Sequence, residues 1–314
     1  MNQSTLRRQA RWLGAGLGLL VLCLAGVADH GPVLGQASAG LVAHEWGVWR
    51  IDARGRVTLD DLEAESPPFV ARVRRRPARI PRIRMGPTTV EKPVLFLYAS
   101  RPTRVRIDVR FEGGTPWLHA PAGRHDGERL SWRGRLDPVG ADLPPLPEVA
   151  PGHWWHHLRA VGASTFRGRT NERFIFYDGV VPLERSFETR GPAQAPSLRA
   201  LGTETDVWVV DRTGYTEYEV RGDVPRRLGN GDAAALRGRL ERELLERGLS
   251  AAEGRSLLDT WAPELLQVTD ADPFPHAIYF VPRDAYDRML PLRIRPTPTE
   301  LVRVGLVIEH LQSP

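Results

Sequence analysis

His44 and Glu45 are neighbours whose imidazole and carboxylate could act in acid–base chemistry or bind a metal ion. The zinc-protease pattern H-E-x-x-H is absent, because position 48 is Val48. Alternating apolar positions in "LVAHEWGVWR" predict a strand that directs His44 and Glu45 to opposite faces. Packing within that strand is therefore the first interpretation, and a catalytic or ligand role is the alternative.

A second group of reactive side chains lies in "GHWWHHLRA", residues 152–160. On a helix, His153 and His157 would share one face at a spacing that suits Zn²⁺. A third ligand would have to come from a distant residue such as His44, Glu45 or His119. We therefore expect no cofactor, with zinc as the alternative.

Tryptophans next to these histidines could stack on the apolar faces of sugars. The candidates for such a glycan platform are Trp154, Trp155, Trp117 and Trp132. Tryptophans also fill protein cores, so the platform requires these rings to be exposed.

Lys92 is the only lysine of the chain. A buried lysine can serve as a base or nucleophile, whereas a lysine at the start of a strand is more often a solvated charge. The sequence has no G-x-S-x-G elbow, phosphate loop or dinucleotide fingerprint, which disfavours the common covalent hydrolases and cofactor enzymes. The catalytic residues, if the protein is an enzyme, stay unknown beyond His44, Glu45 and Lys92.

The first 28 residues have the pattern of a secretory signal peptide. Three arginines precede an uncharged apolar run, Leu13 to Ala28, of about 16 residues, shorter than the roughly 20 that span a membrane. Cleavage is expected after Ala28 or as late as Ala39, which leaves a mature chain without cysteine or membrane span. A periplasmic or extracellular location follows, with a lipoprotein anchored through Cys23 or an uncleaved signal anchor as alternatives.

The chain is arginine-rich, with a net charge of +5 and a pI near 9.8. Seven arginines gather between Arg72 and Arg84, in a segment that also contains two prolines and is expected to form an exposed loop. Outside the cytoplasm, such a loop could meet an anionic envelope component or an acidic glycan. Export and the lack of a nucleic-acid motif exclude nucleic acid as the expected partner.

Hydrophobic periodicity predicts an α+β fold, mainly an antiparallel β-sandwich-like region with a C-terminal helical hairpin and returning strands. Residues 41–222 form the sandwich-like region, in which "KPVLFLYAS" and "RVRIDVRF" are expected to pair as a hairpin. Residues 223–314 hold two helices, capped by Asp232 and by Ser250 with Glu253, and then strands that could belong to the same domain.

Three segments of the chain resemble an uncharacterised family of exported bacterial proteins. These are "HEWG" from His44, "KPVLFLY" from Lys92 and "LPLRIRPTPTELVRV" from Leu290. The chain departs from the family at Val48 and Trp49, where threonine and phenylalanine are usual. The resemblance implies an exported protein of one architecture and no particular activity.

These features together predict a non-catalytic envelope or extracellular binding protein with a glycan or protein ligand. The alternative is a hydrolase acting on an envelope polymer, with His44 or Glu45 and the histidines His153 and His157, and with or without a metal. The sequence leaves the oligomeric state unknown.

Overall fold

The computed structural model describes residues 40–51, 64–73, 89–141, 145–183, 185–190, 197–201, 205–222, 224–270 and 273–311. The expected signal peptide, Cys23 and most of the arginine-rich segment lie outside the described residues. Residues 35–314 form a single unit by their contacts, so the two expected regions 41–222 and 223–314 pack together.

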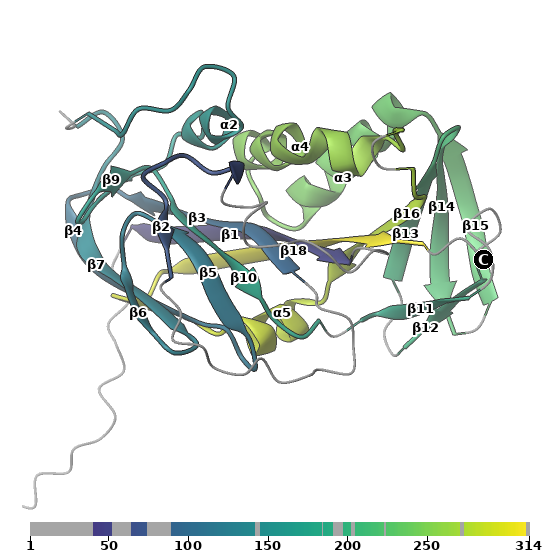
Figure 1. The fold of residues 1–314 in the computed structure, drawn as a ribbon, viewed down its shortest axis with the longest axis horizontal. Coiled ribbons are helices and arrows are strands. Elements are labelled where there is room, and N and C mark those ends of the chain that lie inside the picture. Colours follow the sequence, from purple (N-terminus) through teal and green to yellow (C-terminus); the bar gives the residue numbers. More distant parts are fainter. Residues whose placement is uncertain are drawn as a thin grey trace, which may run out of the picture. The chain divides into compact units, whose positions relative to one another are not determined.

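A ten-stranded sheet lies at the centre of this unit (Figure 1). Its pairs are antiparallel except for β1 and β18, which run parallel and place Glu45 opposite Arg303. In spatial order the strands are β15 (Val224–Gly231), β14 (Gly214–Arg221), β13 (Thr205–Asp211), β16 (His276–Val281), β18 (Glu300–His310), β1 (Leu41–Ile51), β3 (Thr89–Ala99), β10 (Ile175–Val180), β5 (Thr115–Ala120) and β2 (Ala71–Arg72).

Two smaller sheets and a helix cover one face of the large sheet. Their inward side chains, such as Ile107 and Phe187, share a buried core with Leu95 and Tyr279 of the large sheet. The elements are β17 (Leu292–Arg295), β4 (Thr103–Arg110), β7 (Arg129–Asp137), β8 (Thr165–Arg167) and β9 (Asn171–Glu172), with β6 (Arg124–Asp126) paired to β7; the pair β11 (Phe187–Arg190) and β12 (Ser197–Ala200); and α5 (Arg283–Met289).

Three helices cover the opposite face: α2 (Trp155–Arg159), α3 (Ala233–Glu246) and α4 (Ala251–Leu266) (Figure 1). The expected caps are confirmed: Asp232 accepts a hydrogen bond from the Ala235 N–H, and Ser250 and Glu253 form a capping box. The helices bury Leu240, Leu257 and other apolar residues against the sheet. None of the helices within the described ranges is long and apolar enough to cross a membrane.

The structure confirms the α+β class and the sandwich-like layers, but it corrects one strand pairing. β3 and β4 do not form a hairpin, because β3 lies between β1 and β10 whereas β4 lies between β17 and β7. The apolar run of β3 needs cover on both faces, which the middle of the large sheet provides. β4 alternates buried and more exposed residues, so it suits an outer sheet with one face in solvent.

Candidate functional site

A cavity of about 660 Å³ lies in the large sheet, where the last residues of β16 no longer pair with β13 and β18 extends beyond the end of β16. β16 pairs with both strands along its first part and ends at Val281, after which Pro282 begins α5. The cavity therefore lies at the end of β16, between the start of β13 and the first half of β18. Its lining consists of Thr205, Asp206, Glu219, Arg221, Arg247, Phe280, Val281, Pro282, Arg283, Leu301, Val302, Arg303, Val304 and Gly305.

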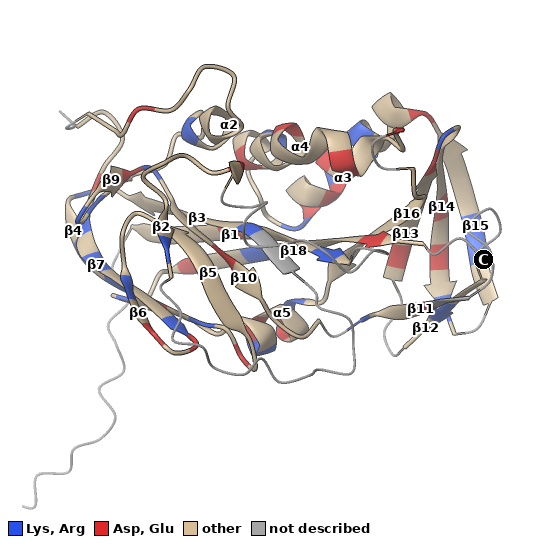
Figure 2. Ribbon diagram, in the orientation of Figure 1, with Lys and Arg blue, Asp and Glu red and all other residues tan. Residues whose placement is uncertain are grey.

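Arginines at the rim of the cavity are paired with carboxylates. Arg221 lies 2.6 Å from Glu219, and Arg283 lies 2.8 Å from Asp287. Figure 2 shows acidic residues on β13 and β14 next to basic residues on β15. The cavity thus has polar walls with balanced charge, and apolar side chains such as Phe280 between them.

Asp206 supplies a carboxyl group to this wall. Burial raises the pKa of Asp206, and the nearby carboxylates Glu243 and Glu217 raise it further, against the opposing charge of Arg239. Arg247 covers the cavity from the end of α3, with its guanidinium carbon 4.0 Å from the centre of the Phe280 ring. Sequence reasoning missed these residues, since they come from segments far apart in the chain and form no motif.

His44 faces the helical layer and is oriented by Glu253. Its Nδ1 lies 2.9 Å from Oε2 of Glu253, and the Tyr98 hydroxyl donates to the same carboxylate. Burial alone would lower the pKa of His44, but the hydrogen bond and charge of Glu253, aided by Glu300, raise it overall. This cluster joins β1 and β3 to the first turn of α4, where Glu253 also completes the capping box.

Glu45 faces the other layer, as strand alternation predicts. It accepts hydrogen bonds from Tyr177 and from Nε of Arg303, and both charged side chains are buried. Nη1 of Arg303 continues to Asp287 at 2.7 Å, and its guanidinium carbon lies 4.1 Å from the centre of the Tyr286 ring. Glu45 therefore ties β1 to β18 and α5, and it does not share a site with His44.

Lys92 occupies a bulge in β3. Trp46 pairs with Val94 and Val48 pairs with Glu91, so that Lys92 and Pro93 together lie opposite Gly47. The φ angle of Lys92 is 52°, in the left-handed region that few residues other than glycine adopt. The bulge directs this side chain into the helical layer, where only 5% of the residue is exposed.

The Lys92 ammonium contacts a carboxylate and an aromatic ring. Nζ lies 3.4 Å from Oε2 of Glu65 and 4.2 Å from the centre of the Trp261 ring. Burial raises the pKa of the neighbouring Glu264 carboxyl, against the opposing charge of Lys92. These contacts suit an ion-pair anchor that links β3 to the helical layer.

His153 and His157 do not stack on one helical face. α2 begins only at Trp155, and the two ring nitrogens of His153 contact the Glu65 carbonyl and the Trp155 N–H. Burial lowers the pKa of His153. Within the described ranges, no group of three or more histidine, cysteine, aspartate or glutamate side chains could hold a metal ion.

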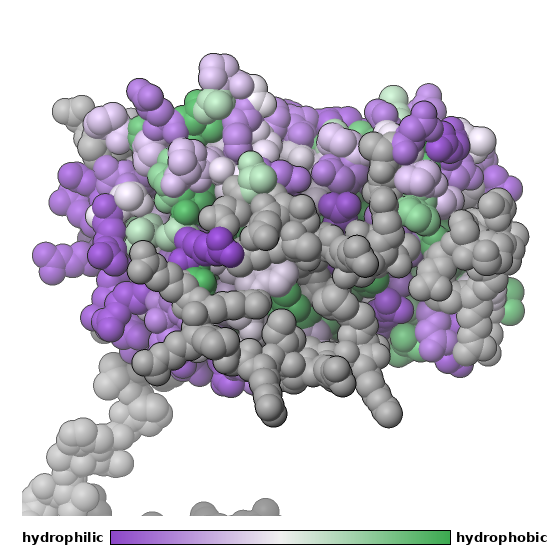
Figure 3. All heavy atoms as spheres, viewed as in Figure 1, coloured by the Kyte–Doolittle hydropathy of each residue, from purple (hydrophilic) through white to green (hydrophobic). Residues whose placement is uncertain are grey.

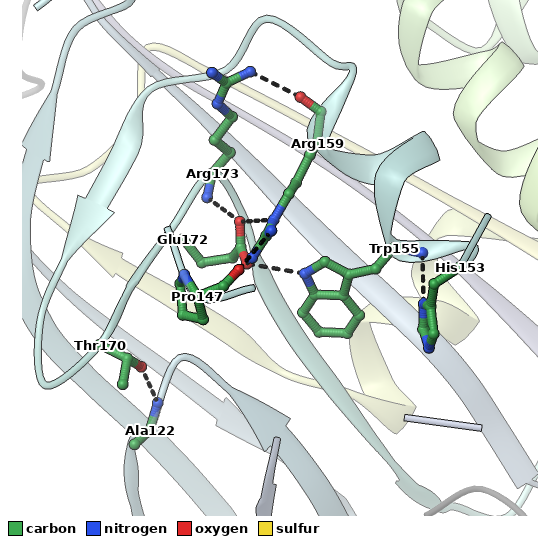
Figure 4. A network of polar contacts seen from close by, with 8 residues as sticks. All are labelled: Ala122, Pro147, His153, Trp155, Arg159, Thr170, Glu172 and Arg173. Atoms are coloured by element: carbon green, nitrogen blue, oxygen red, sulfur yellow. Dashed lines mark hydrogen bonds and ion pairs between the residues drawn. The ribbon is translucent and has the colours of Figure 1, made fainter. Parts of the chain in front are cut away.

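The four tryptophans of the expected glycan platform do not form one surface. Trp155, Trp117 and Trp132 are buried, and only Trp154 is partly exposed. Trp155 is held by a polar network in which its Nε1–H donates to Glu172, which also pairs with Arg159 at 2.6 Å (Figure 4). These rings fill the cores of the two layers, so they present no shared flat face to a sugar.

The first two segments of the family resemblance lie on β1 and β3 of the large sheet, and the last residues of the third lie beside β1 on β18, after its earlier residues form β17 of the smaller sheet. Glu45 of the first segment bonds Arg303 of the third, and a side chain at Gly47 would contact Pro93 of the second. These contacts link the three segments in the fold and assign no activity. Comparisons of the chain with protein-family models, with curated proteins and with solved structures find no match.

Proposed function

We propose that this chain is an exported envelope or extracellular binding protein that holds a protein ligand in the cavity between β13 and β18. The observation that carries the proposal is the cavity itself, whose wall combines charged side chains such as Arg247 and Asp206 with apolar ones such as Phe280 and Leu301. The expectation of export rests on the arginines and apolar run of the first 28 residues.

A protein ligand fits the described surface better than a glycan. Three of the four candidate tryptophans are buried, whereas sugar binding needs exposed rings. Large exposed hydrophobic residues, such as Val139 and Val224, belong to different segments. On the face shown in Figure 3 the described residues are mostly hydrophilic, with small separate hydrophobic areas. A concave site is therefore a better candidate for recognition than a broad flat patch.

The hydrolase alternative receives less support from the geometry. His44 and Glu45 point to opposite layers, and each is engaged by an oppositely charged or polar partner. His153 lies near Lys92 and Glu65, by the last part of α4, whereas His44 contacts Glu253 in its first turn. These residues do not converge on one reacting atom.

The proposal is tested by selecting peptides from a random-sequence displayed library on the full mature protein, and by measuring the affinity of the recovered peptides. We expect Arg247→Glu, which reverses a charge at the cavity rim, to weaken binding at least about tenfold, a loss typical of a disrupted contact. The matched control is Arg212→Glu, an exposed arginine in the β13–β14 turn that does not line the cavity.

Two results would contradict the proposal. One is a selection that yields no peptide with reproducible affinity. The other is an equal loss of binding in Arg247→Glu and Arg212→Glu, because the effect of charge reversal would then not depend on whether the residue lines the cavity. Soluble envelope glycans are tested in parallel. If a glycan binds and no peptide does, the ligand is a sugar and not a protein.

A further inference from the structure

The solvent side of the smaller sheet around β4 and β7 carries a group of arginines. Strand alternation directs Ile107 of β4 and Trp132 of β7 into the core, so the residues on either side of them point to solvent. Figure 2 shows basic residues along these two strands. We define the arginine face as two rows of arginines that cross the sheet, Arg295, Arg106 and Arg133 in the first row and Arg104, Arg135 and Arg167 in the second.

The strand registers place the arginines of each row directly opposite one another. The first row crosses β17, β4 and β7, and the second crosses β4, β7 and β8. Like charges at opposite positions of an antiparallel pair destabilise a sheet. In the large sheet, by contrast, the exposed Arg226 of β15 lies opposite Glu219 of β14. The arginine face therefore concentrates charge at a cost to stability, which is typical of a surface kept for binding.

Carboxylates balance only half of the arginine face. Asp108 pairs with one arginine of the first row and Asp137 with two of the second, at 2.8–3.1 Å. Within the described part of the chain, the other three arginines, Arg104, Arg133 and Arg295, pair with no carboxylate, and all three are exposed. Their guanidinium groups therefore have donors and charge free for an anionic partner.

The arginine face has no apolar centre. None of the large hydrophobic residues exposed in the described ranges, such as Val224 and Leu245, lies on its strands. Interfaces with other proteins usually bury aromatic and aliphatic side chains at their centre. Neighbouring strands are about 4.8 Å apart and alternate residues of one strand about 6.7 Å apart, so the arginines form a grid in two dimensions. A single polymer chain can follow one row of this grid, whereas a bilayer surface meets both rows at once.

We propose that the arginine face docks on the surface of a bilayer that contains anionic phospholipids. Each guanidinium would donate to phosphate oxygens of the lipid head groups, which arginine can bind through two parallel hydrogen bonds. Binding would be electrostatic, because the strands of the face expose no large apolar side chain that could enter the hydrocarbon. The arginine face shares no residue with the cavity wall, so this inference does not depend on the ligand of the cavity.

Sedimentation with vesicles measures the affinity of the full mature protein for lipid. The vesicles contain either phosphatidylcholine alone or phosphatidylcholine and phosphatidylglycerol in equal parts. Each arginine near an anionic surface contributes about fivefold to the affinity, so Arg104→Gln/Arg133→Gln/Arg295→Gln should bind the anionic vesicles about 100-fold more weakly than the wild type. Binding of the wild type should also weaken as the NaCl concentration rises.

A matched control removes the same net charge from other surfaces. Arg227 of β15, Arg242 of α3 and Arg255 of α4 are exposed, and among the described residues they pair with no carboxylate. Their joint replacement by glutamine should change the affinity less than about threefold, because charges more than a Debye length from the membrane are screened. The triple variant of the arginine face should unfold at or above the Tm of the wild type, since it loses like charges. If it does not fold, Arg133→Gln alone should weaken binding about fivefold.

Three results would overturn the inference. The first is a wild type that binds anionic vesicles no better than neutral ones. The second is an equal loss of affinity in both triple variants, because net charge alone would then explain binding. The third is binding of soluble polygalacturonate or inorganic phosphate without binding of vesicles, which would make the partner a soluble anion. A loss confined to the variants of the arginine face would support docking on the bilayer.

Discussion

Glu45→Ala tests whether the buried ion pair between Glu45 and Arg303 stabilises the centre of the fold. The side chain of Glu45 is fully buried, and 1% of the Arg303 side chain is exposed. Removal of the carboxylate leaves a buried guanidinium without its main partner, which costs about 3–5 kcal/mol. The contact of Arg303 with the partly exposed Asp287 remains, so the lower half of this range is expected.

Thermal unfolding followed by circular dichroism measures the effect. For a unit of this size about 2–4 °C is lost per kcal/mol, so a cost of about 3–4 kcal/mol for Glu45→Ala should lower the Tm by about 6–16 °C. Glu188→Ala is the matched control, because its pair with Arg199 is partly exposed on both sides and is worth no more than about 1 kcal/mol. The double variant Glu45→Leu/Arg303→Met should recover most of the loss, since it removes both charges.

A Tm of Glu45→Ala within about 2 °C of the wild type would refute this reasoning. So would a double variant as unstable as Glu45→Ala, because the cost would then come from lost packing and not from the unpaired charge.

Two further predictions concern the pH dependence and the packing of β1 and β18. Because the pKa of His44 is raised and that of Glu253 is lowered, their pairing adds fully to the free energy of unfolding between about pH 4.5 and 6.5. Urea unfolding measures the difference in stability between wild type and His44→Gln, which should be greatest in this pH range. The difference should shrink as the pH rises through the folded pKa of His44 and as it falls through the folded pKa of Glu253. A difference that does not change with pH would contradict the ion pair. Gly305→Ala should cost about 1–3 kcal/mol, since its new Cβ would lie 2.6 Å from the Trp49 ring, whereas Gly162→Ala, with no atom within 4 Å, should change stability by less than about 0.5 kcal/mol. Equal urea midpoints for the two glycine variants would show that β18 can move away from Trp49.

Local patterns in the sequence were sufficient for the elements and for several side-chain directions. Alternation in β1 correctly predicts that His44 and Glu45 face opposite layers, because it depends only on strand geometry. The capping residues Asp232 and Ser250 mark the starts of α3 and α4, because they act on backbone groups within the same turn.

Pairings between distant segments could not be predicted in the same way. A short turn after Ser100 suggests a hairpin, but the two flanking strands join different sheets according to how many of their faces must be buried. The cavity lies where Pro282 ends β16 while β18 continues, and nothing near Pro282 in the sequence identifies Asp206 or Arg303 as parts of the cavity wall.

The position of Lys92 has a practical consequence for labelling. Since the chain has no other lysine and this residue is 5% exposed, an amine-reactive dye, crosslinker or sensor surface would find the α-amino group as its main target on the folded protein. Reaction at Lys92 would in turn report local opening of the helical layer over β3.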